Sequence, residues 1–142
     1  MRFWDSSAII PLCMEEAPSA RVKRLAEEDS ALIVWWGTPI ECYSALARRR
    51  REEMITSTDE ELAQYALALL LEAWTEIEAS RDVREAALRI LRRHPLRAAD
   101  SLQLAAALVW ANWRPAGHEF ICLDQRLGDA AHYEGFTLVP VT

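Results

Sequence analysis

The side chains in this sequence that could do chemistry together are carboxylates, and four of them occupy comparable positions. Asp5 and Asp124 each follow a short apolar run, while Glu41 and Asp100 each fall in the first turn of an expected helix. Carboxylates gathered in one crevice repel one another and need cations, and an all-oxygen set of ligands suits Mg²⁺ or Mn²⁺. A metal ion held in this way can activate water and stabilise the charge that develops during phosphodiester hydrolysis.

Asp100 is the carboxylate with the weakest structural explanation. In the expected helix over residues 98–111, the polar residues are Asp100, Ser101 and Gln103 alone. A helix this apolar is buried, and a carboxylate on it is costly unless a cation or a donor compensates its charge. We therefore expect a functional role for Asp100, although an acid in the first turn also stabilises a helix.

The other three carboxylates also have structural interpretations. Asp5 and Asp124 could cap the helices that follow them. Glu41 is expected to complete a capping box, with Thr38 as N-cap and Pro39 at the first helical position, and this would explain it without any function. The functional interpretation therefore depends on the whole set and not on any single member.

Alternating strands and helices must position these carboxylates. The expected strands are 1–4, 31–36, 75–78, 119–123 and 135–140. Expected helices start at Ser6 (limited by Pro11) and at Ser19, and further helices cover 38–51, 57–74, 81–93, 98–111 and 124–131. This alternation predicts an α/β fold with a mainly parallel sheet of four to five strands. In such a sheet all four positions lie along one edge, where ligands bind.

Composition indicates an ordinary globular protein that occupies one domain, residues 1–142. The sequence is 51% hydrophobic and 27% charged, and its net charge of −6 argues against a protein that coats nucleic acid by bulk charge. No export signal is visible, and the apolar segment 65–71 is far shorter than a membrane span. The three cysteines lie in apolar runs, which is typical of reduced core thiols. We therefore expect a cytoplasmic protein with no membrane contact.

Several kinds of site are absent from the sequence. It contains no P-loop and no Gly-x-Gly-x-x-Gly, so it offers no machinery for a nucleotide cofactor. It has no Gly-x-Ser-x-Gly elbow, and its three histidines and three cysteines do not have the spacing of zinc ligands. What remains is a carboxylate-held metal site without nucleotide machinery, which fits phosphodiester hydrolysis.

Four segments of the sequence resemble the PIN-domain ribonucleases, and within them the VapC-type toxins of bacterial toxin–antitoxin pairs. These segments are 5–9 (DSSAI), 38–46 (TPIECYSAL), 96–107 (LRAADSLQLAAA) and 120–127 (FICLDQRL). Their order, their spacing and the chain length all fit, so the resemblance covers the whole chain. The segment that contains Asp100 is the most specific of the four, and the segment that begins at Asp5 is weak by itself.

The resemblance implies a PIN-like three-layer α/β/α sandwich and a metal-dependent endoribonuclease toxin. Asp5, Glu41, Asp100 and Asp124 would be the catalytic and metal-binding residues, holding one or two Mg²⁺ or Mn²⁺ ions for cleaving RNA. The implied partners are an RNA substrate, a cognate antitoxin protein that inhibits the toxin, and a second copy of the chain in a homodimer.

Residues near these carboxylates have smaller expected roles. Ser7 matches a hydroxyl residue that the family often places beside its first Asp, and Gln103 stands where family members often have His, a difference expected to matter little. Arg97 and Arg126 adjoin Asp100 and Asp124, so both are candidates for phosphate contact. For the arginine run 48–51, stabilisation of a helix C-terminus is favoured over RNA contact.

Two other functions stay open at this point. One is a PIN-like module that binds RNA or metal without catalysis; the complete set of four carboxylates favours the enzyme over it. The other is a phosphohydrolase or phosphoacceptor α/β domain with Asp5 as the nucleophile. It is weakened because no Asp-x-Asp follows the first strand and no partner lysine accompanies a late strand.

Overall fold

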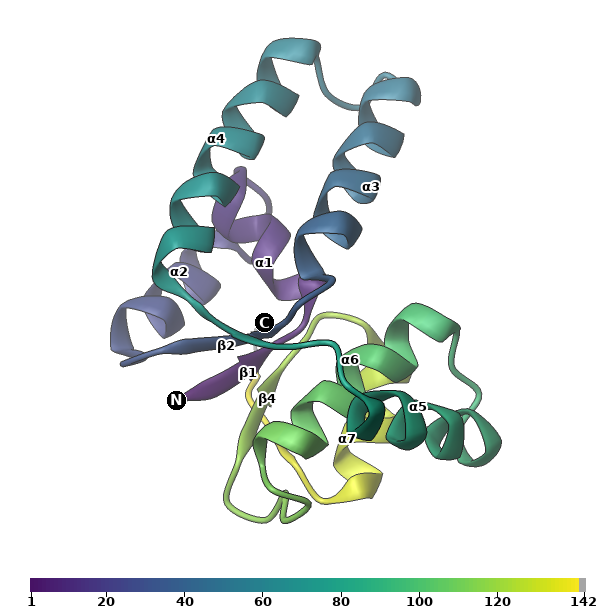
Figure 1. The fold of residues 1–142 in the computed structure, drawn as a ribbon. Coiled ribbons are helices and arrows are strands. Elements are labelled where there is room, and N and C mark those ends of the chain that lie inside the picture. The colour runs from purple at the N-terminus through teal and green to yellow at the C-terminus, as the bar shows by residue number, and fades with distance from the viewer. Residues whose placement is uncertain (141–142) are drawn as a thin grey trace.

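The computed structural model describes residues 1–140, which form one parallel sheet between two layers of helices (Figure 1). The strands are β1 (Arg2–Trp4), β2 (Leu32–Trp35), β3 (Thr75–Ile77), β4 (Glu119–Ile121) and β5 (Thr137–Leu138). The helices are α1 (Ser6–Cys13), α2 (Ser19–Glu28), α3 (Thr38–Arg51), α4 (Ser57–Ala73), α5 (Arg81–Arg93), α6 (Ala98–Trp110) and α7 (Gln125–Glu134). The predicted α/β/α sandwich is confirmed.

The sheet has the strand order β3-β2-β1-β4-β5, and every neighbouring pair is parallel. In the central pair, Trp4 of β1 lies opposite Ile121 of β4. The register continues one step further, because the backbone N–H of Asp5 donates a 2.9 Å hydrogen bond to the carbonyl of Ile121. The chain therefore leaves β1 and β4 at the same edge of the sheet, as expected for adjacent parallel strands.

Strand residues alternate between two hydrophobic cores, one on each face of the sheet. Phe3 and Phe120 pack in the core that α5, α6 and α7 cover, whereas Trp4 and Ile121 pack in the core under α1 to α4. Figure 1 shows these helix groups on opposite sides of β1, β2 and β4. Residues 104–108 of α6 are all buried, which explains why this helix is so apolar.

Helices α1 and α7 continue further than the sequence predicts. The prediction that Pro11 limits the first helix is wrong: α1 continues to Cys13 with Pro11 inside it and buried, so its ring adds apolar contact where one backbone donor is lost. α7 likewise continues past residue 131 to Glu134. A capping box closes the start of α4. Thr56 is the N-cap, and its side chain and that of Asp59 each accept from the other's backbone N–H.

The strands are shorter than the apolar runs that contain them. β4 ends at Ile121 rather than at Leu123, because the Leu123 N–H donates to the hydroxyl of Ser7 instead of to a neighbouring strand. The apolar run thus continues past the strand into the turn that precedes Asp124. Within residues 1–140, no helix is both long enough and apolar enough to cross a membrane.

Candidate active site

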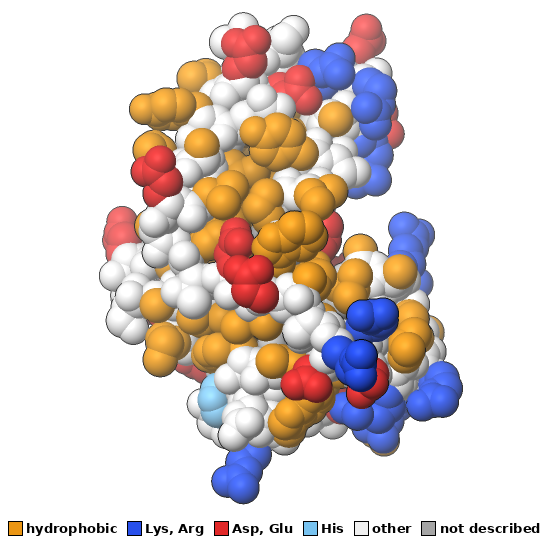
Figure 2. Space-filling view, in the orientation of Figure 1, with side chains coloured by type: hydrophobic (Ala, Val, Ile, Leu, Met, Phe, Trp, Pro, Cys, Tyr) orange, Lys and Arg blue, Asp and Glu red, His pale blue; other side chains and the backbone are white. Residues whose placement is uncertain are grey.

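The structure brings the four carboxylates of the sequence analysis to one cleft at the carboxyl edge of the sheet. The cleft has a volume of about 610 Å³, and Asp5, Glu41, Asp100 and Asp124 all line it. Asp5 directly follows β1, Asp124 lies just after β4, and the other two are in the first turns of α3 and α6. A recess opens at the right edge of Figure 2, between α3 above and the start of α6 below.

Asp5 is the most deeply buried of the four, with only 3% of its surface exposed. Burial raises the pKa of this carboxyl to about 6; two hydrogen bonds from Ser7 lower the pKa, and the charge of Asp100 raises it again. Oδ2 of Asp5 accepts from the Ser7 backbone N–H at 3.1 Å, so Asp5 also serves as the N-cap of α1. The capping interpretation of Asp5 is therefore correct without excluding a role in the cleft.

Ser7 lies beside Asp5, as the resemblance implied, and joins two elements of the site. Its hydroxyl donates a 2.6 Å hydrogen bond to Oδ2 of Asp5 and accepts a 2.8 Å hydrogen bond from the backbone N–H of Leu123. Leu123 immediately precedes Asp124. One hydroxyl thus connects the carboxylate after β1 to the chain that delivers the carboxylate after β4.

Glu41 does not form the capping box that the sequence predicts. Gly37, not Thr38, is the N-cap of α3, and no side chain caps that helix. The carboxylate of Glu41 instead accepts two hydrogen bonds from other helices. Ser6 Oγ donates to Oε1 at 2.9 Å, and Gln103 Nε2 donates to Oε2 at 3.1 Å. Helix capping therefore does not explain the presence of Glu41.

The pKa of Glu41 is raised to about 7. Burial is the largest cause, the charge of Asp5 adds to it, and the charge of Asp100 raises it slightly further. The hydrogen bonds from Ser6 and Gln103 act in the opposite direction because they stabilise the ionised form. The influence of Asp5 and Asp100 shows that these three carboxylates are close enough to destabilise one another's charges.

Gln103 is the part of the site that sequence reasoning missed. It is completely buried, and its amide nitrogen donates to Thr38 Oγ1 as well as to Glu41, both at 3.1 Å. That having Gln rather than His here matters little stays a prediction, but the side chain itself directly contacts one of the four carboxylates. A signal was present: Gln103 lies three residues after Asp100, hence on the same face of an otherwise apolar helix.

The carbonyl oxygen of Gln103 is the only buried side-chain nitrogen or oxygen in residues 1–140 with no hydrogen-bond partner. Leaving a buried acceptor unpaired costs about 1–3 kcal/mol. A leucine at this position would avoid that cost and continue the apolar character of α6. What the amide adds over an apolar side chain is its two donated hydrogen bonds, which both reach the start of α3.

Asp100 and Asp124 form the more open half of the site. Burial raises the pKa of the half-buried Asp100, and the charge of Asp124 raises it further; the Arg97 backbone N–H and the charges of Arg97 and Arg126 lower it. Asp124 is exposed and caps α7, with Oδ1 accepting from the Leu127 N–H at 2.9 Å. Its Oδ2 makes no hydrogen bond within residues 1–140.

Arg97 and Arg126 stand where the sequence analysis places them, beside the carboxylates. Together with Asp100 and Asp124 they line a second hollow of about 760 Å³. This hollow and the first cleft share Asp100 and Asp124, so the two recesses meet at these carboxylates. Positive side chains therefore flank the acidic centre on the α6 and α7 side.

The arginine run at the end of α3 divides into paired and unpaired members. Arg49 forms an ion pair with Glu16, and Arg50 forms one with Glu60 at 2.7 Å. Arg48 is exposed, lines the cleft with the carboxylates, and makes no ion pair within the described residues. Figure 2 shows Lys and Arg side chains gathered over this end of α3, above the recess.

The carboxylate oxygens of the cleft suit a hard cation such as Mg²⁺. In this structure they do not surround a single position that could hold one. Within residues 1–140, no three Asp, Glu, His or Cys side chains are grouped tightly enough to hold a metal ion as they stand. Oxygen donors from four elements nevertheless share the cleft, with charges that disfavour one another. The charge of a bound cation would offset that repulsion.

No family model matches the sequence, and no curated protein sequence matches it. Several solved structures do. VapC20 from Mycobacterium tuberculosis, a sarcin–ricin loop cleaving toxin, matches with a TM-score of 0.71 and 19% identity over 96% of this chain and 97% of its own. A toxin–antitoxin complex from Klebsiella pneumoniae matches with a TM-score of 0.68 and 14% identity over 100% and 98%. FitAcB from Neisseria gonorrhoeae matches with a TM-score of 0.66 and 15% identity over 99% and 98%.

These matches extend over nearly the full length of both chains in each comparison. They agree with the all-parallel five-stranded sheet and the helices on both of its faces. At identities below 20% the likeness concerns the fold. The chain therefore has the PIN-like fold of the VapC-type toxins.

Proposed function

We propose that this protein is a Mg²⁺- or Mn²⁺-dependent endoribonuclease toxin that hydrolyses RNA phosphodiester bonds. The observation that carries the proposal is the convergence of Asp5, Glu41, Asp100 and Asp124 on one cleft at the carboxyl edge of the sheet. These residues are spread over almost the whole sequence, and each is brought to the cleft by a different element. Such an arrangement is hard to explain by helix capping alone, since the Glu41 side chain caps no helix and instead accepts from Ser6 and Gln103 of two other helices.

The chemistry of the cleft fits a divalent cation. All four ligands offered are carboxylate oxygens, which Mg²⁺ and Mn²⁺ prefer over the nitrogen and sulfur ligands typical of zinc. The raised pKa values of Asp5 and Glu41 arise partly from neighbouring carboxylates, so the metal-free site lacks positive charge. A bound ion would supply that charge, activate a water molecule and stabilise the developing charge on the phosphate.

Each protein group then has a definable task. Ser7 holds Asp5 in place through its 2.6 Å hydrogen bond. Arg97 and Arg126 flank Asp100 and Asp124, where they can neutralise phosphates of a strand that crosses the cleft. Without such cations, RNA would not approach a site this acidic on a protein of net charge −6.

The proposal includes the partners that the resemblance implied. VapC20 is described as a toxin that cleaves the sarcin–ricin loop, and another match is a toxin–antitoxin complex. For this chain we propose an RNA substrate, inhibition by a cognate antitoxin, a homodimer and a cytoplasmic location. A short reading frame directly upstream that encodes a DNA-binding antitoxin would support the toxin assignment.

The two competing functions are weaker. A phosphoacceptor with Asp5 as nucleophile needs an accessible carboxylate, but Asp5 is 3% exposed and bound to Ser7. A module that only binds RNA would not need four carboxylates in one cleft, because their repulsion lowers stability. A module that binds metal without catalysis is distinguished by the cleavage assay.

The direct test is a cleavage assay with purified protein and a structured RNA in Mg²⁺, in Mn²⁺ and in EDTA. We expect cleavage with either metal and none in EDTA, with full recovery when the metal is restored. Cleavage that continues unchanged in EDTA would exclude the metal mechanism. Binding of RNA without cleavage in either metal would favour the module.

A further inference from the structure

The carboxylate of Glu41 is held from two sides by helices that carry or adjoin the other buried carboxylates. Ser6, which donates to Oε1 at 2.9 Å, directly follows Asp5 at the start of α1. Gln103, which donates to Oε2 at 3.1 Å, lies one turn after Asp100 on α6. Each oxygen of Glu41 thus receives one hydrogen bond from a different helix, and the plane of the carboxylate is fixed relative to both.

The amide of Gln103 has no other use for its donors. Its nitrogen carries two N–H groups, and these go to Glu41 Oε2 and to Thr38 Oγ1, so both contacts are to the first turn of α3. Its oxygen has no partner within residues 1–140. An apolar side chain would fill the same position without leaving a buried acceptor unpaired. The amide therefore connects α6 to the carboxylate-bearing turn of α3.

We propose that Gln103 is a positioning residue, whose buried amide sets the orientation in which Glu41 meets the metal ion. This inference rests on the proposed function, because it takes the cleft to be a cation site. Among the described residues, each Glu41 oxygen accepts one hydrogen bond, which leaves it a lone pair for a ligand. Mg²⁺ demands near-ideal octahedral geometry and Mn²⁺ favours the same six oxygen ligands, whereas Ca²⁺ tolerates irregular geometry. The amide therefore matters more for the small ions than for Ca²⁺.

The test measures Mn²⁺ binding to the full chain by electron paramagnetic resonance, without RNA. We compare the wild type, Gln103→Met, Glu41→Gln and the double variant. Methionine keeps the length and removes both donors. Gln103→Met should weaken Mn²⁺ binding about ten-fold or more, the usual effect of removing a group that orients a metal ligand. Ca²⁺ affinity, measured by competition, should fall clearly less.

The double variant separates positioning from a general loss of structure. If Gln103 acts through Glu41, Gln103→Met should have no further effect once Glu41→Gln has removed the carboxylate. If the substitution merely loosens α6, the two losses should add. Ser101→Ala is the matched control, because Ser101 is buried on the same helix and donates only to the Ala98 carbonyl. Its Mn²⁺ affinity should equal that of the wild type.

The outcomes distinguish this inference from the proposed function. A wild type that binds no Mn²⁺ overturns both. A wild type that binds Mn²⁺ no more tightly than Gln103→Met leaves the metal site standing and overturns the role of Gln103, as does full additivity in the double variant. Should Gln103→Met not fold, Gln103→Leu removes the same donors with another apolar side chain, and unchanged Mn²⁺ affinity there overturns the proposal.

Discussion

The hydroxyl of Ser7 lies 2.6 Å from Oδ2 of Asp5 and donates a hydrogen bond to it. The same hydroxyl accepts from the backbone of Leu123, next to Asp124. The carboxylate that follows β1 and the turn that follows β4 are therefore fixed relative to each other by one side chain. This relationship explains why a serine is needed two positions after Asp5, and it can be tested directly.

Ser7→Ala should destabilise the protein by about 1–2 kcal/mol, because it removes one hydrogen bond to a carboxylate and one to a backbone N–H. It should also raise the pKa of Asp5 further, since the Ser7 hydroxyl lowers it. Urea unfolding at pH 8 measures the first effect. The control is Ser44→Ala, which removes another cleft hydroxyl, one with no hydrogen bond within the described residues. Equal stabilities of the two variants would contradict the role of Ser7.

The metal-free protein should lose stability as the pH rises from about 3 to about 8. The pKa values of Asp5 and Glu41 rise on folding from 3.8 to about 6 and from 4.5 to about 7. Between the unfolded and folded values, the folded state binds more protons, so stability falls as pH increases. The loss begins at about pH 3, is complete at about pH 8, one unit above the folded-state pKa of Glu41, and is on the order of 3 kcal/mol per group.

Urea unfolding in EDTA across this pH range measures the effect, and Glu41→Gln supplies the control. The amide cannot ionise, so the variant should show a clearly shallower fall than the wild type. Stability of the wild type that rises through this range would show that the carboxyls are stabilised in their charged forms.

Asp5→Asn should abolish cleavage while preserving or raising the stability of the metal-free protein. The substitution removes a charge that burial and Asp100 disfavour, and the amide oxygen can still accept from Ser7. Thermal unfolding in EDTA at pH 8 should show an equal or higher Tm, at about 2–4 °C per kcal/mol gained. A marked drop in Tm would show that Asp5 is mainly structural.

Arginines around the cleft should differ in how much they contribute to RNA binding. Replacing Arg48, Arg97 or Arg126 by Gln should lower affinity and reduce the salt dependence, by about 0.7 in log K against log salt for each phosphate that is no longer neutralised. Arg50→Gln should change little, since Arg50 is paired with Glu60.

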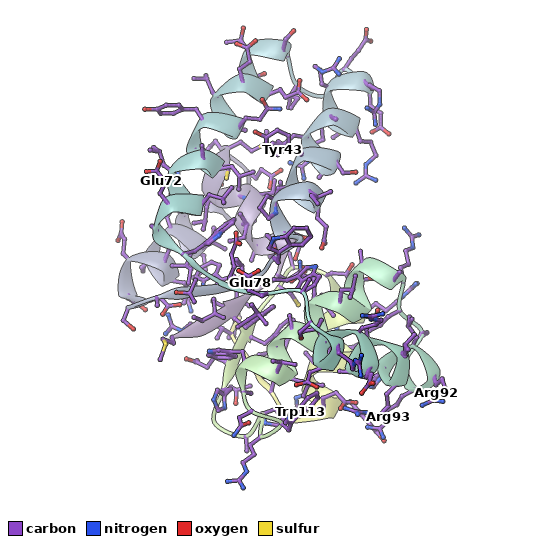
Figure 3. All side chains as sticks on the ribbon, in the orientation of Figure 1. Tyr43, Glu72, Glu78, Arg92, Arg93 and Trp113 are labelled. Atoms are coloured by element: carbon purple, nitrogen blue, oxygen red, sulfur yellow. The ribbon has the colours of Figure 1, made fainter. Side chains whose placement is uncertain are left out.

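These affinities are best measured in an Asp100→Asn background, so that the RNA is not cleaved. A second control is Arg92→Gln, because Arg92 projects from the end of α5, away from α3 (Figure 3). If Arg92→Gln reduced the salt dependence as much as Arg126→Gln, RNA would be held by general surface charge and not by the cleft.

Much of the fold could be predicted because it follows from local patterns. The apolar runs before Asp5 and Asp124 become the adjacent parallel strands β1 and β4, so the rule that such strands end at one edge places both carboxylates correctly. The apolar helix behind Asp100 is buried as its composition indicates. The lengths of the strands are less predictable, because an apolar run does not reveal where strand pairing stops. β4, for example, ends before Leu123, whose N–H donates to Ser7.

The hydrogen bonds of Glu41 could not be predicted because their donors come from distant parts of the chain. The local pattern from Thr38 to Glu41 matches a capping box. In the structure, however, Thr38 is buried and its hydroxyl accepts from Gln103, sixty-five positions later. Likewise, nothing local indicates that Arg50 is neutralised by Glu60 while Arg48 stays free within the described residues. Such pairings depend on tertiary packing, which spacing along the sequence does not encode.

The central claim is that the four carboxylates form one metal-dependent catalytic site, and Asp100→Asn tests it most directly. The variant keeps the size of the side chain and removes the charge of a half-buried residue that lines the cleft. Cleavage of a structured RNA is followed in Mg²⁺ for the wild type and the variant, and in EDTA for the wild type. We predict cleavage by the wild type in Mg²⁺ alone, with the variant reduced to the background rate. Cleavage that survives both the substitution and EDTA would contradict the claim.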